Sequence, residues 1–124
     1  MSKTVLVVDD SAMMRKIVIK NLKELRGDLE IMEAGDGKDA LAAFSSNSID
    51  MVITDWNMPN MSGIDLVKEI RKLDPDKKVP VVMVTSEATA DKVKEAVMAG
   101  ANNYIAKPFT PEGFKQKMGP MLGS

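Results

Sequence analysis

The sequence predicts an α/β fold in which a doubly wound, five-stranded parallel sheet carries helices on both faces. Two observations predict it. Short, nearly continuous apolar runs alternate with segments whose apolar residues recur at helical spacing, giving five βα units. Five units are too few for an eight-fold barrel, so we expect an open sheet with right-handed crossovers. The 124 residues, 44% of them hydrophobic, fit one domain over residues 1–124 with no separate output domain.

The predicted strands are short and rich in β-branched residues, as expected of strands that are covered on both faces. In chain order they span residues 5–8, 29–32, 49–53, 79–84 and 104–106. The first, third and fourth predicted helices each present one apolar stripe. These stripes comprise Met14, Ile17, Val18, Leu22 and Leu25; then Leu66, Val67, Ile70 and Leu73; then Ala90, Val93, Ala96 and Val97.

Capping residues mark the ends of the predicted helices. Candidate starts are Asp36, Ser62, and Thr110 followed by Pro111 at the first helical position. Candidate stops are Gly27, Asp74-Pro75 and Gly100.

The last helix is the weakest element. Helical spacing joins Phe114, Met118, Met121 and Leu122, but Gly113 falls in the first turn. Gly119-Pro120 should end or kink the helix near Met118. We therefore expect a short or frayed terminus.

Composition excludes several classes of chemistry and partner. The formal charge is −1 and the basic residues form no long run, so we expect neither a nucleic-acid partner nor a membrane-surface partner. Cysteine and histidine are absent, which excludes thiol nucleophiles, zinc-thiolate sites and Ser-His or Cys-His catalytic pairs. The apolar stretches are too short to span a bilayer and the N-terminus lacks a signal peptide, so a cytoplasmic protein is expected.

Polar side chains gather where the predicted strands end. Asp9 and Asp10 follow the first strand, Asp55 the third, Thr85 and Ser86 the fourth, and Lys107 the fifth. In open α/β sheets the ligand site lies at these carboxyl ends. Each residue also has a simpler interpretation: Asp10 or Ser11, and Thr85 or Ser86, can cap helices, while a lysine before proline can be a solvated loop residue.

The conjunction of these residues favours a phosphoryl site. Three neighbouring carboxylates repel one another unless a cation neutralises them, and oxygen ligands alone suit Mg²⁺. A carboxylate at the end of a buried strand, as at Asp55, is costly to desolvate. Aspartate is also a known nucleophile in forming aspartyl phosphates, so Asp55 is the candidate acceptor.

The chain resembles the receiver domains of bacterial two-component response regulators, and in particular the single-domain chemotaxis regulators. The resemblance rests on "LVVDDS", "MMRKIVIKNLKEL", "ITDWNMPNMSG", "PVVMVTSEA" and "AGANNYIAKPFTP", and covers essentially the whole chain. It implies a flavodoxin-like fold with strand order 2-1-3-4-5. The family's last helix is longer and smoother than the one expected here.

The resemblance also implies roles for individual residues. Asp55 is the implied phosphoacceptor, and Asp9, Asp10, Asp55 and the backbone carbonyl of Asn57 are the implied Mg²⁺ ligands. Lys107 and Thr85 correspond to the family's lysine and switch hydroxyl, and Tyr104 to its switch aromatic. Asn57 and Glu87 are candidates for tuning dephosphorylation, and the Lys107-Pro108 bond is implied to be cis. The role of Trp56 stays open between guarding the site, contacting a partner and lying on the surface.

The implied function is a monomeric signalling protein that catalyses only its own phosphorylation and dephosphorylation. Without histidine in the chain, the phosphoryl donor must be external, and the resemblance implies a chemotaxis-type histidine kinase. It implies the flagellar motor switch protein as target, bound through the surface of the fourth helix, fifth strand and fifth helix. A phosphatase is allowed for as a further partner.

Three alternatives remain. A haloacid-dehalogenase-type phosphohydrolase would place its nucleophile on the first strand in a D-x-D motif, whereas here the first-strand acids are adjacent, the candidate nucleophile follows the third strand, and no cap domain is expected. A flavodoxin-like nucleotide-binding module would need glycine in the loop "DDSAMM". Within the family, a phosphorelay intermediate or phosphate sink differs only in its partners.

Overall fold

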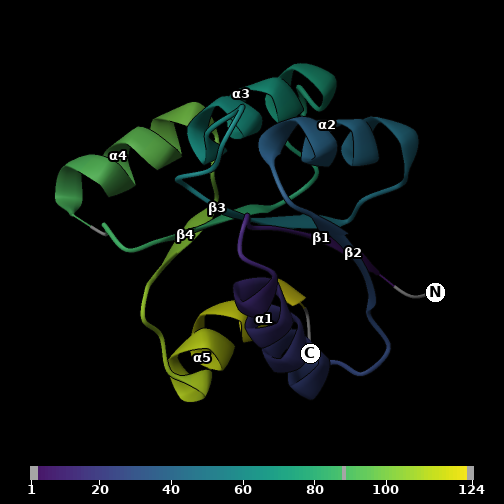
Figure 1. Cartoon of the computed structure of the whole chain (residues 1–124), viewed down its shortest axis with the longest axis vertical. Helices are drawn as coiled ribbons and strands as arrows, with labels where there is room; N and C mark the ends of the chain where they lie inside the picture. The colour runs from purple at the N-terminus through teal and green to yellow at the C-terminus, as the bar shows by residue number, and fades with distance from the viewer. Residues whose placement is uncertain (1–2, 88, 123–124) are drawn as a thin grey trace.

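The computed structural model describes residues 3–87 and 89–122, and within them five strands alternate with five helices (Figure 1). The strands are β1 (Thr4–Val8), β2 (Glu30–Ala34), β3 (Met51–Asp55), β4 (Val81–Thr85) and β5 (Asn103–Ala106). The helices are α1 (Ala12–Leu25), α2 (Gly37–Ser46), α3 (Gly63–Leu73), α4 (Ala90–Ala99) and α5 (Pro111–Leu122).

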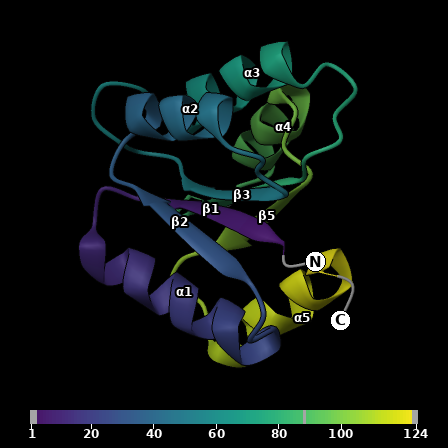
Figure 2. The ribbon, with the colours of Figure 1, turned by 90° about the vertical axis from the view of Figure 1, so that its right-hand side faces the viewer.

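The strands form one parallel sheet in the order β2-β1-β3-β4-β5, which confirms the predicted fold class and strand order. Helices α1 and α5 cover one face of the sheet, and α2, α3 and α4 cover the other (Figures 1 and 2). The order reverses between β1 and β3, where adjacent strands send their chains to opposite faces. Ligand sites of open α/β sheets form at such a point.

Two apolar layers hold the helices against the sheet. One layer contains Val5, Val7, Ile53, Leu22 and Phe114 and lies under α1 and α5. The other contains Leu6, Val52, Met83, Leu66 and Ile70 and lies under α2, α3 and α4. Because alternate residues of each central strand enter opposite layers, β1, β3 and β4 are buried on both faces, as their sequences predict.

The edge strand β2 departs from that expectation. Its residues are mostly partly exposed, with only Ala34 buried, because an edge strand pairs on one side alone. It also begins and ends later than the predicted range 29–32. Leu29 is buried but lies just before the strand, in the turn that connects α1 to β2. Its apolar side chain therefore resembles a strand residue in the sequence without being one.

Side-chain caps start the helices largely where the sequence predicts. Asp36 and Ser62 accept the N–H groups of Asp39 and Asp65, and Thr110 accepts that of Gly113. Ser11 caps α1, which decides between the two candidates there. Helix α4 is capped by Thr89, so neither Thr85 nor Ser86 has the capping role that their position allowed.

The helix ends confirm two of the predicted stops. Asp74 is the C-cap of α3, and Gly100 ends α4 in the left-handed conformation with φ of 119°. A side chain at Gly100 would also collide with Arg71, whose Cγ lies 2.7 Å from the position of an added Cβ. Helix α1 ends one residue earlier than expected, at the C-cap Arg26 rather than at Gly27.

The expectation of a short last helix is wrong. Helix α5 continues through Gly119 and Pro120 to Leu122. Met118 and Leu122 are fully buried under the sheet, at 0% and 1% exposed, and Arg26 donates a 2.8 Å hydrogen bond to the carbonyl of Leu122. Burial of this apolar face and the external hydrogen bond outweigh the local cost of glycine and proline.

No helix within residues 3–87 and 89–122 combines the length and apolar character needed to cross a membrane.

Candidate functional site

The register of the sheet brings the predicted site residues together. Val8 of β1 pairs with Thr54 of β3, so Asp9 and Asp55 are the next residues on two adjacent strands. On the other side of β3, Asp55 pairs with Val84 of β4. Thr85 in turn pairs with Ala106 of β5, the residue before Lys107. Four strand ends therefore converge on one edge of the sheet within two steps of the ladder.

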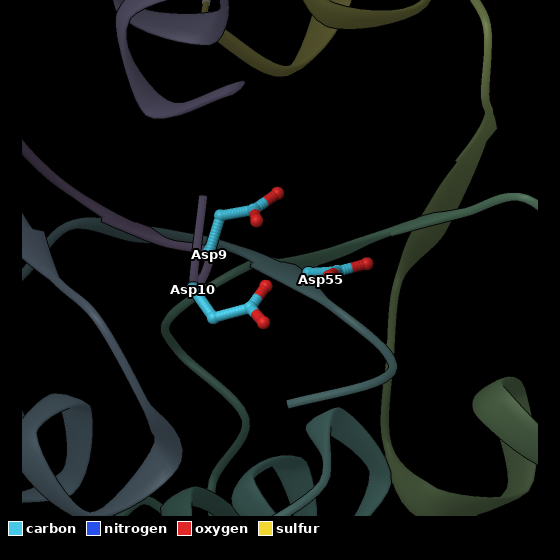
Figure 3. A group of neighbouring side chains, drawn as sticks. All are labelled: Asp9, Asp10 and Asp55. Atoms are coloured by element: carbon cyan, nitrogen blue, oxygen red, sulfur yellow. The ribbon is translucent and has the colours of Figure 1, made fainter. Parts of the chain in front are cut away.

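Three carboxylates extend toward the same side at this edge (Figure 3). Asp9, Asp10 and Asp55 each offer one oxygen atom, and these oxygens all lie within 4.8 Å of one another. Asp9 and Asp55 are 4% and 9% exposed, whereas Asp10 is exposed. The two acids that follow β1 and the one that ends β3 thus surround a common space that opens to solvent beside Asp10.

Lys107 reaches across the cluster from the end of β5. Its Nζ atom lies 3.1 Å from Oδ1 of Asp55 and 3.2 Å from Oδ2 of Asp9. The side chain of Lys107 is 19% exposed, so these are largely buried ion pairs. The Lys107-Pro108 bond that precedes the turn is cis, as the resemblance implies.

Burial raises the pKa of Asp55 above its ordinary value. Lys107 opposes that shift by hydrogen bond and charge, while the neighbouring charge of Asp9 adds to it. For Lys107 itself burial acts to lower the pKa, but Asp55 and Asp9 outweigh burial and the net pKa is raised. The ammonium is therefore held in its charged form between two acids.

Backbone N–H groups fix the orientation of both buried acids. The N–H of Ser11 donates to Oδ1 of Asp9 at 2.9 Å, and the N–H of Trp56 donates to Oδ1 of Asp55 at 2.8 Å. The loop that follows Asp55 closes at Gly63, whose N–H donates to the Trp56 carbonyl at 2.7 Å. An added Cβ at Gly63 would collide with the carbonyl oxygen of Asp55.

The cluster fits a hard divalent cation. When all three acids are ionised, one lysine neutralises one of three negative charges. The remaining negative charge and an all-oxygen donor set match the preferences of Mg²⁺. The predicted contribution of the Asn57 carbonyl stays a prediction, although Asn57 does lie in the exposed loop two residues beyond Asp55.

The two predicted switch residues lie on neighbouring strands. Thr85 ends β4 at 3% exposed, and its hydroxyl oxygen accepts the N–H of Glu87 at 3.0 Å. Tyr104 on β5 is partly buried against the core. The Nζ atom of Lys117 on α5 lies 4.0 Å from the Tyr104 ring centroid and donates to the Tyr104 carbonyl at 3.0 Å. Tyr104 therefore packs against the layer under α2, α3 and α4, while Lys117 of α5 contacts its ring at the edge of the sheet.

Trp56 does not lie on the surface, which removes one of its three interpretations. It is 8% exposed and belongs to the core layer under α4. Lys92, in the first turn of α4, places its Nζ atom 5.0 Å from the Trp56 ring centroid and 4.0 Å from Glu87. Glu87 itself is exposed.

Arg15 was missed as a site residue. Its guanidinium donates to the carbonyl of Asp9 at 2.6 Å and to Glu33 at 2.9 Å, and thereby ties the loop after β1 to the edge strand. A signal was present, because Arg15 lies in the first turn of α1, where no acidic residue occurs. A cation at that end of a helix is unfavourable without an oxygen partner nearby.

Comparison with known families gives one match over nearly the whole chain. Residues 5–118 match the response regulator receiver domain.

Individual proteins agree with that match. The chain is 46% identical over 114 residues to the chemotaxis protein CheY of Pseudomonas aeruginosa, covering 92% of this chain and 91% of that protein. The structure of the chemotaxis response regulator CheY4 of Vibrio cholerae superimposes with a TM-score of 0.86 at 35% identity, over 95% of this chain and 97% of that one. A chain in the structure of a CheX-CheY-BeF₃-Mg²⁺ complex from Borrelia burgdorferi superimposes with a TM-score of 0.87 at 28% identity. The match covers 97% of this chain and 89% of that one.

Proposed function

The chain belongs to the response regulator receiver family, as a domain of the CheY chemotaxis type, and from that premise we propose that a histidine kinase phosphorylates it on Asp55. The phosphorylated form then binds the flagellar motor switch. The observation that carries the proposal is the convergence of Asp9, Asp10, Asp55 and Lys107 at one sheet edge.

Asp55 is the proposed nucleophile because it matches the family's phosphoacceptor in "ITDWNMPNMSG" and because Lys107 contacts its buried carboxylate. One of its carboxylate oxygens would attack phosphorus, and the leaving group would depart with the electron pair of the broken bond. The N–H of Trp56 orients the carboxylate at 2.8 Å, and Lys107 at 3.1 Å is positioned to bind an oxygen of the transferred group. Phosphoryl transfer needs mainly such positioning and charge neutralisation.

Asp9, Asp10 and Asp55 would hold Mg²⁺, together with the Asn57 carbonyl. When bound, the ion supplies neutralisation of the charge that builds up on the phosphoryl oxygens. The protein prepares for this by orienting Asp9 through Ser11 and Arg15 before any ligand arrives.

The proposed switch runs from Thr85 to Tyr104. A phosphoryl group on Asp55 offers acceptor oxygens to the Thr85 hydroxyl, which would exchange its contact with the Glu87 N–H for one with phosphate. The space that Thr85 leaves would admit the Tyr104 ring, and the surface formed by α4, β5 and α5 would change. Phosphorylation would thus shift the equilibrium between an inactive and an active conformation. The free energy of that shift equals the difference between the phosphoryl group's interaction energies in the two conformations.

The partners follow from the same proposal. The chain contains no histidine, so the phosphoryl donor must be external: a histidine kinase, or a small molecule such as acetyl phosphate in vitro. The related CheY of Borrelia burgdorferi forms a complex with CheX in the presence of BeF₃ and Mg²⁺, which supports BeF₃ as a probe of the activated state. We expect a monomer that acts in the cytoplasm on no metabolic substrate, and a phosphatase as a further partner. No observation favours the relay or phosphate-sink alternative over this function.

Phosphorylation in vitro tests the proposal. With Mg²⁺ and acetyl phosphate, intact-mass spectrometry should show one added phosphoryl group on the wild-type chain and none on Asp55→Asn. Asp65→Asn is the matched control, because Asp65 is an exposed acid in the first turn of α3. Unchanged labelling of Asp55→Asn would remove Asp55 as acceptor. Capture of the motor switch protein with and without beryllofluoride then tests the output.

A further inference from the structure

A groove lies next to Lys107, the lysine that contacts the acid cluster. It has a volume of about 380 Å³ and is lined by Met14, Ile17, Ser86, Lys107, Pro108 and Phe109. It therefore runs between α1 and the turn that joins β5 to α5. Its volume is at the lower end of the roughly 300–1,000 Å³ typical of small-molecule sites.

The groove and the acid cluster share Lys107. Lys107 lines the groove, while its Nζ atom contacts Asp55 and Asp9 at 3.1 and 3.2 Å. Ser86, a second lining residue, directly follows the predicted switch residue Thr85. A molecule whose anionic end is bound at Lys107 therefore has this groove next to it.

The lining is apolar away from that shared edge. Met14, Ile17, Pro108 and Phe109 contribute carbon and sulfur surfaces, and the side-chain polar groups come from Ser86 and Lys107. Ile17 remains 40% exposed although it is a large aliphatic residue. An occupant that fits this distribution has an anionic head and a short hydrocarbon body.

We propose that this groove is a leaving-group subsite, which binds the hydrocarbon part of an acyl phosphate while Asp55 takes the phosphoryl group. The inference rests on the function proposed above and adds a binding site for the part of the donor that leaves. A carboxylate oxygen of Asp55 forms a new bond to phosphorus, and the bond between phosphorus and the bridging acyl oxygen breaks. The acyl group leaves as a carboxylate with that electron pair. One mixed anhydride replaces another, so no proton or further reactant is needed.

The subsite predicts that phosphorylation depends on acyl chain length. Acetyl phosphate and butanoyl phosphate release carboxylates of nearly equal basicity, so their rates differ mainly through binding of the hydrocarbon. Each methylene transferred fully from water strengthens binding roughly fourfold, and butanoyl phosphate has two more methylenes than acetyl phosphate. Because an open groove buries only part of the chain, we expect butanoyl phosphate to react about three to ten times faster than acetyl phosphate.

Two variants test whether the groove causes this preference. Ile17→Ser removes an aliphatic wall of the groove and should bring the ratio of butanoyl to acetyl rates close to unity. Leu73→Ser is the matched control, since Leu73 is a 55% exposed aliphatic residue at the end of α3, and it should leave the ratio at the wild-type value. Timed quenching and intact-mass spectrometry give the rates, and circular dichroism checks that each variant is folded.

The outcomes separate the two proposals. Labelling by neither donor would refute the proposed function. Equal rates for the two donors on the wild-type chain, with labelling intact, would refute the subsite alone. A chain-length preference that Ile17→Ser leaves unchanged would also refute it. A loss of the preference in Ile17→Ser but not in Leu73→Ser would support it.

Discussion

Lys107 and Asp55 are 52 residues apart in sequence, yet the Lys107 Nζ atom lies 3.1 Å from Oδ1 of Asp55. The same ammonium also contacts Asp9, so a single positive charge holds two buried carboxylates at one sheet edge. Both acids would repel each other more strongly without it. Lys107 therefore has a measurable effect on the cluster even before any phosphoryl group arrives.

Lys107→Ala should separate metal binding from signalling. Removing the ammonium makes the acid cluster more negative, so Mg²⁺ affinity should be equal to or higher than that of the wild type, while phosphorylation-dependent partner binding should be lost. Titration with Mg²⁺, followed by the fluorescence of Trp56 as the single tryptophan, measures the affinity. Lys115→Ala, which removes a more exposed lysine paired with Glu24, is the control. Loss of Mg²⁺ binding in Lys107→Ala would contradict the role given to this lysine.

Gly63→Ala should destabilise the fold and disturb the acceptor loop. The added Cβ would meet the Asp55 carbonyl and approach the Trp56 Cα at 3.0 Å, so backbone must shift. Overpacking of this kind costs about 1–3 kcal/mol in the free energy of unfolding, measured by urea titration. Gly119→Ala is a control of opposite sign, because its Cβ has no atom of the described residues within 4 Å and alanine favours a helix by about 0.5–1 kcal/mol. Equal effects at both positions would exclude the steric explanation.

Lys117→Met should make activation easier. In this structure the ammonium lies 4.0 Å from the Tyr104 ring centroid, and this contact would have to break if the ring turns inward. An exposed cation–π contact is worth about 0.5–1 kcal/mol, so the affinity for beryllofluoride should rise about two- to fivefold. The measurement is a Trp56 fluorescence titration, with Lys115→Met as the matched lysine. An unchanged affinity would mean that the contact is equally strong in both states.

Acid should weaken the turn between α3 and β4 through Asp74. Burial acts to raise the pKa of Asp74, but the N–H groups of Val79 and Lys78 and the charge of Arg71 outweigh it, so the net pKa lies below the ordinary 3.8. The folded state therefore favours the carboxylate. This stabilisation is complete above the unfolded pKa, near 3.8, and is lost as the pH falls through the lower folded value.

Asp74→Asn tests this dependence on pH. At neutral pH the variant should lose about 1–3 kcal/mol in the free energy of unfolding, because charge-assisted hydrogen bonds are replaced by weaker ones. The difference from wild type should shrink below about pH 4. Urea titrations across the pH range measure it. Asp76→Asn, which alters an exposed acid in the same turn, is the control. A difference that stays constant into acid would rule out titration of Asp74.

The fold could be predicted because its central strands are buried on both faces. Val5–Val8 and Met51–Ile53 are apolar without interruption, a pattern that amphipathic helices do not show. The site was harder. Strand ends could be identified from the sequence, but the adjacency of β1 and β3 depends on strand order, which came from the family resemblance. Once that order is known, Asp9 and Asp55 must be neighbours.

The remaining errors concern contacts made in three dimensions. Local propensity predicts a break at Gly119-Pro120, and it is overridden by burial of Met118 and Leu122. The contact between Trp56 and Lys92 joins a loop to a helix 36 positions further on, and no local pattern reports it. Arg15 could be predicted in part. Its unfavourable place in the first turn of α1 indicates that it has an oxygen partner, but the sequence does not identify that partner as the Asp9 carbonyl.

The pairing of Val8 with Thr54 has a consequence for how this chain tolerates changes in length. Successive residues of a strand point to opposite faces of the sheet, so the direction of the Asp55 side chain depends on its position in β3. Deleting one residue inside that strand would turn the acid toward the opposite layer of helices. A residue added to the exposed turn at 75–78 would leave the spacing of the three acids and Lys107 intact. Insertions and deletions should therefore accumulate in the outer turns of such domains, while the lengths of the inner strands stay constant.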